Sequence, residues 1–224
     1  MRKAVVLVSG GMDSAVLLYF LKKVRHYELS ALLFDYGQRH RRELQSATAL
    51  LRAAKVPYHA VKLQFPWKGS SLLDRGQKIP RRQSVSEIAG EIPSTYVPAR
   101  NLIFLSLATG YAEAIGAERI FYGANAVDYS GYPDCRPVFV DHLNRTIRVG
   151  TKSGSERKII RIEAPLLRLT KGEIALLGKK CGVPFEKTWS CYAGGKKPCG
   201  KCDSCLLRAR GFAEAKMKDP LETK

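Results

Sequence analysis

A glycine-rich turn near the N-terminus separates a short apolar run from a helical pattern. Residues 3–8 form an apolar run with several β-branched side chains, and this run ends in Ser9-Gly10-Gly11. From Ala15 to Val24, apolar residues recur at three- and four-residue spacing, as they do on one face of a helix. The chain therefore begins with a predicted strand, a tight turn and a predicted helix.

Strand and helix patterns continue to alternate along the chain. Alternation at this pitch predicts an α/β fold in which a doubly wound parallel sheet is covered on both faces. Ligands of such sheets bind at the carboxyl ends of the strands, near the point where strand order reverses. Residues 66–95 are polar and rich in Gly, Ser and Pro, so we expect an irregular excursion there. We expect further strands at residues 29–34, 58–63, 119–122 and 159–162, and helices at residues 43–55, 101–115, 137–149, 171 onward and 204–216.

The composition is that of a globular protein with an unusual charge. The 224 residues suffice for a substantial core, and their longest apolar runs are too short to cross a bilayer. The N-terminus does not resemble a signal peptide, so we expect a cytoplasmic protein with no membrane segment. Lys and Arg number 38 against 20 Asp and Glu, which gives a net charge of +18. A nucleic-acid surface is one interpretation of this charge, but no basic cluster interleaves with aromatic residues as in single-strand binders.

The turn at residues 9–14 has the composition of a phosphate-binding loop. Its two glycines allow the backbone to turn tightly and to approach a ligand. The helix that follows presents free N–H groups and the positive end of its dipole to an anion, and Ser9 and Ser14 add hydroxyl donors. The pattern is neither Walker A nor the dinucleotide motif. A plain strand-to-helix turn, with Asp13 near the helix cap, is the alternative interpretation.

Four of the six cysteines lie close together near the C-terminus. Spacings of seven, two and two residues bring four thiols within reach of one ion, and zinc takes four sulfur ligands. An iron–sulfur cluster, a redox-active Cys-x-x-Cys pair and free cysteines are the alternatives. We expect a closed, structural site, and we expect Cys181 to be a core residue. The predicted ligands of one zinc ion per chain are Cys191, Cys199, Cys202 and Cys205.

The sequence Ser-Gly-Gly-x-Asp-Ser after a strand resembles the loop of the ATP pyrophosphatase superfamily. Further segments, at residues 34–40, 97–101, 123–136 and 188–192, resemble the 7-cyano-7-deazaguanine synthase (QueC) family. The likeness extends from about residue 5 to residue 212. It implies an adenine nucleotide alpha hydrolase-like (HUP) fold. We expect this nucleotide-binding domain at residues 1–165 and a C-terminal helical region with the cysteine site at residues 166–224.

The resemblance implies an ATP-dependent C–N ligase of queuosine or archaeosine biosynthesis. Such an enzyme cleaves ATP between the α and β phosphates with Mg²⁺. It would turn 7-carboxy-7-deazaguanine and ammonia into 7-cyano-7-deazaguanine (preQ0) by adenylation, amide formation and dehydration. A homodimer is also implied. The net charge of +18 leaves two alternatives open, a tRNA-base-modifying enzyme of the same superfamily and a zinc-stabilised nucleic-acid-binding module without catalysis.

The resemblance also suggests roles for individual residues. Asp13, Arg100, Lys171 and Asp128 are the candidate catalytic residues; for Lys171 a surface salt bridge is the alternative, and for Asp128 a turn-forming role. The expected ATP-binding residues are Val8, Ser9, Gly10, Gly11, Met12, Asp13, Ser14, Phe34, Asp35 and Gln38. The expected substrate-binding residues are Arg100, Asn101, Asn125, Asp128 and Tyr129.

Overall fold

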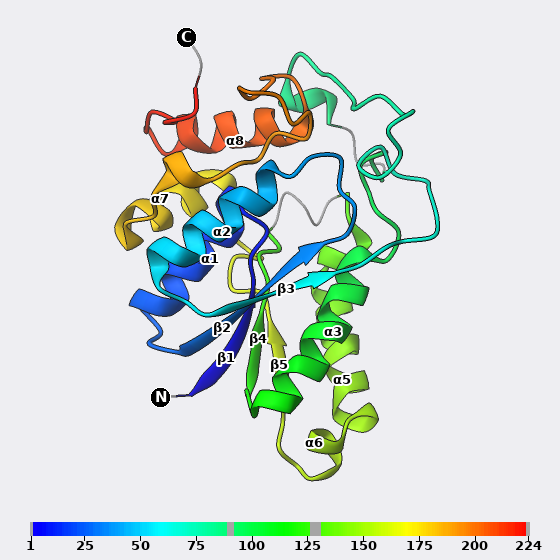
Figure 1. Ribbon diagram of the computed structural model, residues 1–224. Coiled ribbons are helices and arrows are strands. Elements are labelled where there is room, and N and C mark those ends of the chain that lie inside the picture. Colours follow the sequence, from blue (N-terminus) through cyan, green and yellow to red (C-terminus); the bar gives the residue numbers. More distant parts are fainter. Residues whose placement is uncertain (1, 89–91, 126–130, 223–224) are drawn as a thin grey trace.

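A parallel sheet runs through the protein (Figure 1). The computed structural model describes residues 2–88, 92–125 and 131–222. Within these residues the sheet has five strands in the order β3-β2-β1-β4-β5, and every neighbouring pair is parallel. Strand order therefore reverses at β1, which confirms the doubly wound α/β fold. The strands are β1 (Lys3–Leu7), β2 (Glu28–Asp35), β3 (Tyr58–Lys62), β4 (Arg119–Phe121) and β5 (Arg161–Glu163).

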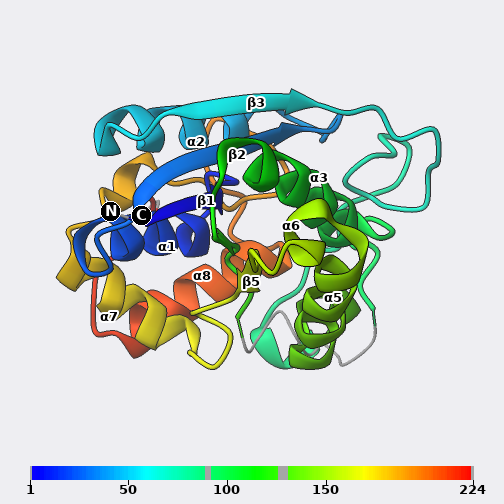
Figure 2. The same ribbon diagram turned by 90° about the horizontal axis from the view of Figure 1, so that it is seen from below.

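Helices cover both faces of the sheet, as Figure 2 shows. On one face lie α1 (Met12–Lys23), α2 (Arg42–Ala54), α7 (Lys171–Cys181) and α8 (Asp203–Glu214). On the other face lie α3 (Arg100–Ile115), α5 (Pro137–Gly150) and the short α6 (Lys152–Ser155). Three single-turn 3₁₀ helices, η1 (Val85–Glu87), η2 (Pro133–Cys135) and η3 (Phe185–Lys187), lie in the connections of the described chain.

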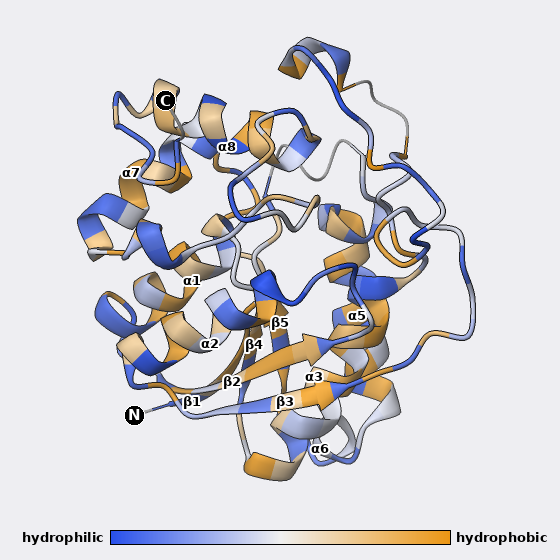
Figure 3. Ribbon diagram, turned by 45° about the horizontal axis from the view of Figure 1, so that its top comes forward, coloured by the Kyte–Doolittle hydropathy of each residue, from blue (hydrophilic) through white to orange (hydrophobic). Residues whose placement is uncertain are grey.

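The central strand β1 is buried on both sides. Ala4 and Val6 pack into the core under α1 and α2, whereas Val5 packs into the core under α3 and α5. Successive side chains of a strand point to opposite faces, so a strand covered on both faces must be apolar throughout. The run at residues 3–8 meets this requirement, and Figure 3 shows the same hydrophobic character along β2.

The predicted elements are present, with shifts at their ends. β5 begins at Arg161 instead of residue 159, because Ile159 lies before the strand and is 54% exposed. Helix α7 begins after Thr170, which forms the expected capping box with Glu173. Cys181 at its other end is buried, as expected. No helix in the described ranges has the length and apolar character that a bilayer crossing requires.

The C-terminal helices share the core of the sheet. Ile174 of α7, Phe185 of η3 and Phe212 of α8 belong to the same buried cluster as Leu17 and Leu18 of α1. Phe185 and Phe212 meet edge to face with their ring centroids 5.0 Å apart. This packing positions α7 and α8 beside the loop at residues 9–14. The division at residues 165 and 166 stays a prediction.

Candidate active site and metal centre

A cavity of about 240 Å³ lies at the carboxyl ends of the central strands. Its walls come from the loop after β1, the ends of β2 and β4, the first turns of α2, α3 and α7, and residues 189–192. This is the edge at which a doubly wound sheet binds its ligands. The position agrees with the expectation from the strand pattern.

The loop after β1 is held in a tight turn by its own polar groups. Ser14 Oγ accepts from Ser9 N at 3.2 Å and donates to the carbonyl of Gly11 at 3.1 Å. Gly10 has a φ of +89°, and a Cβ there would lie 2.3 Å from the carbonyl oxygen of Glu43. Only glycine fits at this position, because the first turn of α2 packs directly on the loop. Gly11 caps α1, so the free N–H groups of that helix face the cavity.

Asp13 forms the centre of a buried polar cluster. Its Oδ2 accepts from Lys171 Nζ at 2.6 Å and from Asn125 Nδ2 at 2.8 Å. The Lys171 side chain is only 9% exposed, so its interpretation as a surface salt bridge is wrong. Asp13 Oδ1 is also buried and has no hydrogen-bond partner among the described residues. The cluster joins three predicted site residues from α1, α7 and the end of β4.

Arg100 and Asn101 open helix α3 at the opposite wall of the cavity. Arg100 Nη1 donates to the hydroxyl of Tyr36 at 3.4 Å, and no carboxylate of the described chain forms an ion pair with it. Asn101 is engaged within the protein: its N–H donates to Asp134 at 3.1 Å and its Nδ2 to Cys135 Sγ at 3.5 Å. Burial raises the pKa of Asp134, although hydrogen bonds from Asn101 and the charge of Arg100 oppose the shift.

The predicted nucleotide residues do not all face the cavity. Val8, Met12, Phe34 and Gln38 line it. Gln38 also holds the turn after β2, because its Oε1 accepts from Tyr36 N at 2.9 Å. Asp35 and Gly10 are not among the lining residues of the described chain; Gly10 lies beneath α2, and Asp35 accepts from Gly37 N at 3.5 Å. The predicted residues Asp128 and Tyr129 lie outside the described residues.

Glu43 lines the cavity, and sequence reasoning missed it. Burial raises the pKa of its carboxyl to about 7, against the opposing charge of Arg100 and with a further contribution from Cys191. An acidic residue in the first turn of a helix is common, because it complements the helix dipole. That position therefore carried no signal of a site. Other lining residues that were not predicted as site residues are Tyr36, Tyr122, Trp189, Tyr192 and Arg208.

The four predicted cysteine ligands converge. Their Sγ atoms all lie within 4.8 Å of one another, which fits a single tetrahedral metal ion. Cys191 Sγ accepts from Cys199 N at 3.3 Å and from Ala193 N at 3.4 Å. The thiols of Cys202 and Cys205 donate to Cys191 and hold its pKa far below the usual range. The cluster can hold a metal ion, and it is closed by protein on most sides because three of its four cysteines are buried.

The segment next to the cysteine cluster packs against the loop at residues 9–14. Trp189 N donates to the carbonyl of Gly10 at 2.8 Å, and the guanidinium of Arg42 lies 4.6 Å from the centre of the Trp189 ring. Both Trp189 and Tyr192, which precede and follow Cys191, line the cavity. The segment that carries Cys191 therefore forms one wall of the candidate active site.

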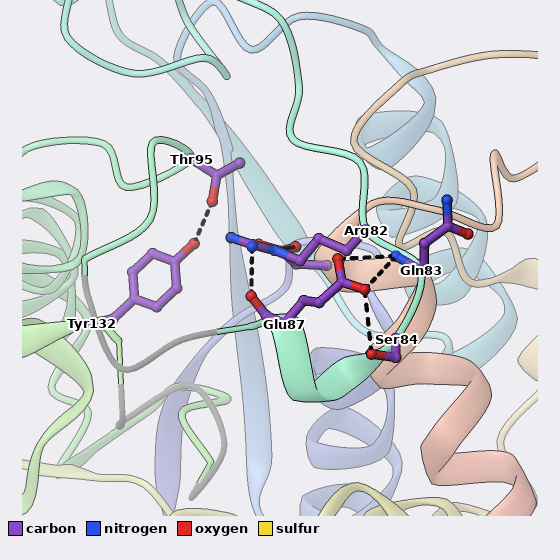
Figure 4. Close-up of polar contacts among 7 residues, drawn as sticks. Arg82, Gln83, Ser84, Glu87, Thr95 and Tyr132 are labelled. Atoms are coloured by element: carbon purple, nitrogen blue, oxygen red, sulfur yellow. Dashed lines mark hydrogen bonds and ion pairs between the residues drawn. The ribbon is translucent and has the colours of Figure 1, made fainter.

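The excursion between β3 and α3 reaches across to the cysteine cluster. Arg82 N donates to the carbonyl of Lys201 at 2.8 Å, and Arg82 Nε pairs with Asp203 at 2.7 Å. Arg82 also donates to the carbonyl of Glu87, and the hydroxyls of Thr95 and Tyr132 are 2.9 Å apart. Figure 4 shows how these side chains lie. As expected, the described part of residues 66–95 is irregular apart from η1.

Comparison with known proteins identifies the family of this chain. The sequence profile of the family described as "Queuosine biosynthesis protein QueC" matches residues 3–216. A protein of Nostoc punctiforme named 7-cyano-7-deazaguanine synthase is 52% identical over 222 residues, which cover 98% of each chain. A protein of Thermoplasma acidophilum with the same name is 51% identical and covers 99% of this chain and 92% of its own. The structure titled "Structure of NMN synthetase from Francisella tularensis" has a TM-score of 0.53 and 15% identity, covers 96% of this chain and 87% of its own, and has the same fold.

Proposed function

This chain belongs to the QueC family of queuosine biosynthesis proteins, and we propose that it is an ATP-dependent ligase that makes 7-cyano-7-deazaguanine. Its substrates are 7-carboxy-7-deazaguanine, ammonia and ATP. The observation that carries the proposal is the match to relatives of this name over nearly the whole chain. The position of the cavity at the strand ends supports it, because the phosphate loop and a second, aromatic wall face the same space.

The chemistry explains why ATP is needed. A carboxylate is a poor electrophile, because its leaving group would be oxide. Attack of a carboxylate oxygen on the α phosphorus releases pyrophosphate and gives an acyl adenylate. Ammonia then displaces AMP and forms the amide. A second adenylation, on the amide oxygen, lets AMP leave with that oxygen while two protons are lost, and the nitrile remains.

The loop at residues 9–14 is the proposed phosphate site. Negative charge grows on the transferred phosphorus and its leaving group, and fixed donors in a water-poor site stabilise such charge most effectively. We assign this role to the α1 N–H groups, the hydroxyls of Ser9 and Ser14, and Lys171. Lys171 Nζ is already held by Asp13 at 2.6 Å, so little reorganisation is needed on binding.

Arg100 is the proposed partner of a second anion. It faces the cavity from the wall opposite the phosphate loop and pairs with no carboxylate of the described chain. An unpaired cation in a partly buried position is stabilised when an anion binds beside it. We assign Arg100 to the substrate carboxylate or to the phosphate of the adenylate. Asn125, a predicted substrate residue, is fully buried, is not among the described residues that line the cavity, and donates to Asp13.

Two metal ions belong to the proposal. The buried Asp13 Oδ1 lacks a partner among the described residues and suits Mg²⁺, which prefers oxygen ligands. Mg²⁺ would neutralise charge on the phosphates. The four cysteines suit one zinc ion per chain, in a structural role. We further propose that the enzyme is a cytoplasmic homodimer.

The test is a reaction that contains the purified protein, ATP, Mg²⁺, ammonium and 7-carboxy-7-deazaguanine. Mass spectrometry should find 7-cyano-7-deazaguanine and AMP, both dependent on every component. Formation of ADP in place of AMP would contradict cleavage between the α and β phosphates. AMP release that requires tRNA, without nitrile, would favour the tRNA-modifying alternative, for which the net charge of +18 is the supporting observation.

A further inference from the structure

We infer that Glu43 determines which base the enzyme accepts, by accepting hydrogen bonds from the donor edge of the deazaguanine ring. This inference rests on the proposed function and deepens it. The edge in question carries a ring N–H beside an exocyclic amino group. Two neighbouring donors match the two oxygens of one carboxylate, and hydrogen bonds to an ionised acceptor are the strong ones.

The position of Glu43 relative to the phosphate loop is fixed by the backbone. Glu43 lies in the first turn of α2, and its side chain faces the cavity. Its carbonyl oxygen lies so close to Gly10 that a Cβ on that glycine would approach within 2.3 Å. The turn of α2 and the phosphate loop therefore form one packed unit. A group bound at the Glu43 carboxylate is held at a defined place beside the reacting phosphates.

Glu43 has no internal partner that would explain its presence in the cavity. Among the described residues, none donates a hydrogen bond to its carboxylate, and none forms an ion pair with it. Burial raises the pKa of Glu43 to about 7, although the charge of Arg100 opposes the shift. The residue is half-buried and its side chain is open to the cavity, so a ligand that covers the carboxylate must offer donors of its own.

Glu43 and Arg100 form a complementary pair of contacts for a dipolar ligand. The two side chains line the same cavity, and they influence each other electrostatically but do not form an ion pair. The substrate has donors on one edge of its ring and an anionic carboxylate on the other side. The Glu43 carboxylate suits the donor edge of such a molecule, and the Arg100 guanidinium suits its carboxylate. Phe34 and Phe104, stacked with centroids 4.0 Å apart, form part of that wall.

Other donors in the reaction could reach a carboxylate in this cavity: the adenine amino group and the ribose hydroxyls of ATP, and ammonium. Ribose and ammonium have no planar ring to pack against the aromatic wall. Adenine has one, but the ring nitrogen beside its amino group is an acceptor, so of the two bases the deazaguanine is the one that presents two neighbouring donors to the carboxylate. The three candidate ligands predict different kinetic effects of a substitution at Glu43. If Glu43 binds ATP, the substitution would weaken ATP binding. If Glu43 binds ammonium, the substitution would raise the apparent KM for ammonium.

The test compares the substrate with an analogue that lacks only the exocyclic amino group, in the wild-type enzyme and in the Glu43→Gln variant. Glutamine keeps the shape of the side chain but replaces one acceptor with a donor. The wild type should prefer the natural substrate by about 100-fold in kcat/KM, since the analogue leaves a buried acceptor unpaired. In Glu43→Gln this preference should fall below about 5-fold, with the KM for ATP and for ammonium unchanged.

Glu28→Gln is the matched control, because Glu28 is an exposed residue that opens β2, at the opposite end of the sheet. It should keep the full preference. Equal discrimination by the wild type and Glu43→Gln would overturn the inference, as would a variant whose main defect is the KM for ATP or ammonium. Failure of the wild type to form any nitrile would instead overturn the proposed function. Unchanged circular dichroism of the variant shows that it is folded.

Discussion

Lys171 and Asp13 form a buried ion pair at the proposed phosphate site. Their side chains are 9% and 18% exposed and meet at 2.6 Å. Removal of one partner from such a pair leaves a buried charge without compensation, and this typically costs about 3–5 kcal/mol. Lys171→Met should therefore lower the free energy of unfolding by about 2–4 kcal/mol, because Asn125 still donates to Asp13. Urea denaturation measures this change.

The double variant Asp13→Asn/Lys171→Met separates stability from activity. It removes both charges, so it should recover most of the stability that Lys171→Met loses. Its rate of AMP formation should stay at least about 100-fold below that of the wild type, because the proposed phosphate site lacks both the Asp13 carboxylate and the Lys171 ammonium group. A double variant that regains activity together with stability would show that the pair has only a structural role.

Glu43 should make the stability of the ligand-free protein depend on pH. Its pKa is raised from 4.5 to about 7 in the folded state, mainly by burial. The folded state therefore holds its proton at pH values where the unfolded chain has released it. This contribution to stability is complete below about pH 4.5 and is lost as the pH rises through about 7.

Glu43→Gln removes this dependence. Relative to wild type, the variant should gain about 1–3 kcal/mol in the free energy of unfolding between pH 5 and pH 8. Denaturant midpoints of both proteins, measured across that range, give the difference. Asp134 also has a raised pKa, but it is common to both proteins and cancels in the comparison. Parallel pH curves for the two proteins would contradict the assignment of the raised pKa to Glu43.

At the scale of elements, one arginine ties the excursion after β3 to helix α8. The Arg82 side chain pairs with Asp203 and donates to the carbonyl of Glu87. Its backbone N–H donates to the carbonyl of Lys201, and this bond stays when the side chain is removed. Arg82→Ala should release this segment locally, so limited proteolysis within residues 66–88 should become several-fold faster. The global stability should fall by only about 1–2 kcal/mol, because charged hydrogen bonds are lost at the surface of the fold.

The neighbouring Arg81 provides the control. Its side chain is exposed and forms no hydrogen bond or ion pair with any described residue. Arg81→Ala makes the same chemical change one residue away, and its cleavage pattern should match that of the wild type. If the two variants are cleaved at equal rates, the contact with α8 does not hold the excursion in place.

Most elements could be predicted because their patterns are local. The continuous apolar run of β1 and the capping box at Thr170 and Glu173 are both visible in the sequence and present in the structure. The start of β5 was predicted two residues early, because Ile159 has strand propensity but lies outside the sheet. Propensity does not reveal where the neighbouring strand ends, and β4 pairs with β5 only from Arg161 onward.

The candidate site was only partly predictable for a similar reason. The phosphate loop and the cysteine cluster are contiguous motifs, and the structure brings each together. The ion pair of Lys171 with Asp13 joins residues 158 positions apart, so no local pattern announces it. Glu43 was missed because burial and an absent partner are properties of the folded chain. Asp35, which was expected to bind ATP, does not line the cavity among the described residues.

At the scale of the whole molecule, the proposed metal centre should support both fold and activity. Metal binding to a site that exists only in the folded chain contributes directly to folding free energy. Elemental analysis should find about one zinc ion per chain. Removal of the ion by a chelator should unfold at least the C-terminal third and abolish nitrile formation, and the far-ultraviolet circular dichroism should report the loss of helix.

Two cysteine variants test the location of the metal. Cys205→Ala removes one of the four clustered thiols and should lower the zinc content well below one per chain. Cys181→Ala removes a thiol that is buried in the separate core beneath α7 and should leave the zinc content unchanged. A circular dichroism spectrum that does not change after complete removal of zinc would contradict the structural role.

Use of one phosphate loop for two successive adenylations is the central claim, and an oxygen label tests it most directly. The protein is supplied with 7-carboxy-7-deazaguanine whose two carboxylate oxygens are ¹⁸O, and the AMP and nitrile are counted by mass spectrometry. We predict two AMP for each nitrile, with one ¹⁸O atom in every AMP, because each carboxylate oxygen leaves on a phosphate. Unlabelled AMP, or one AMP for each nitrile, would contradict this account.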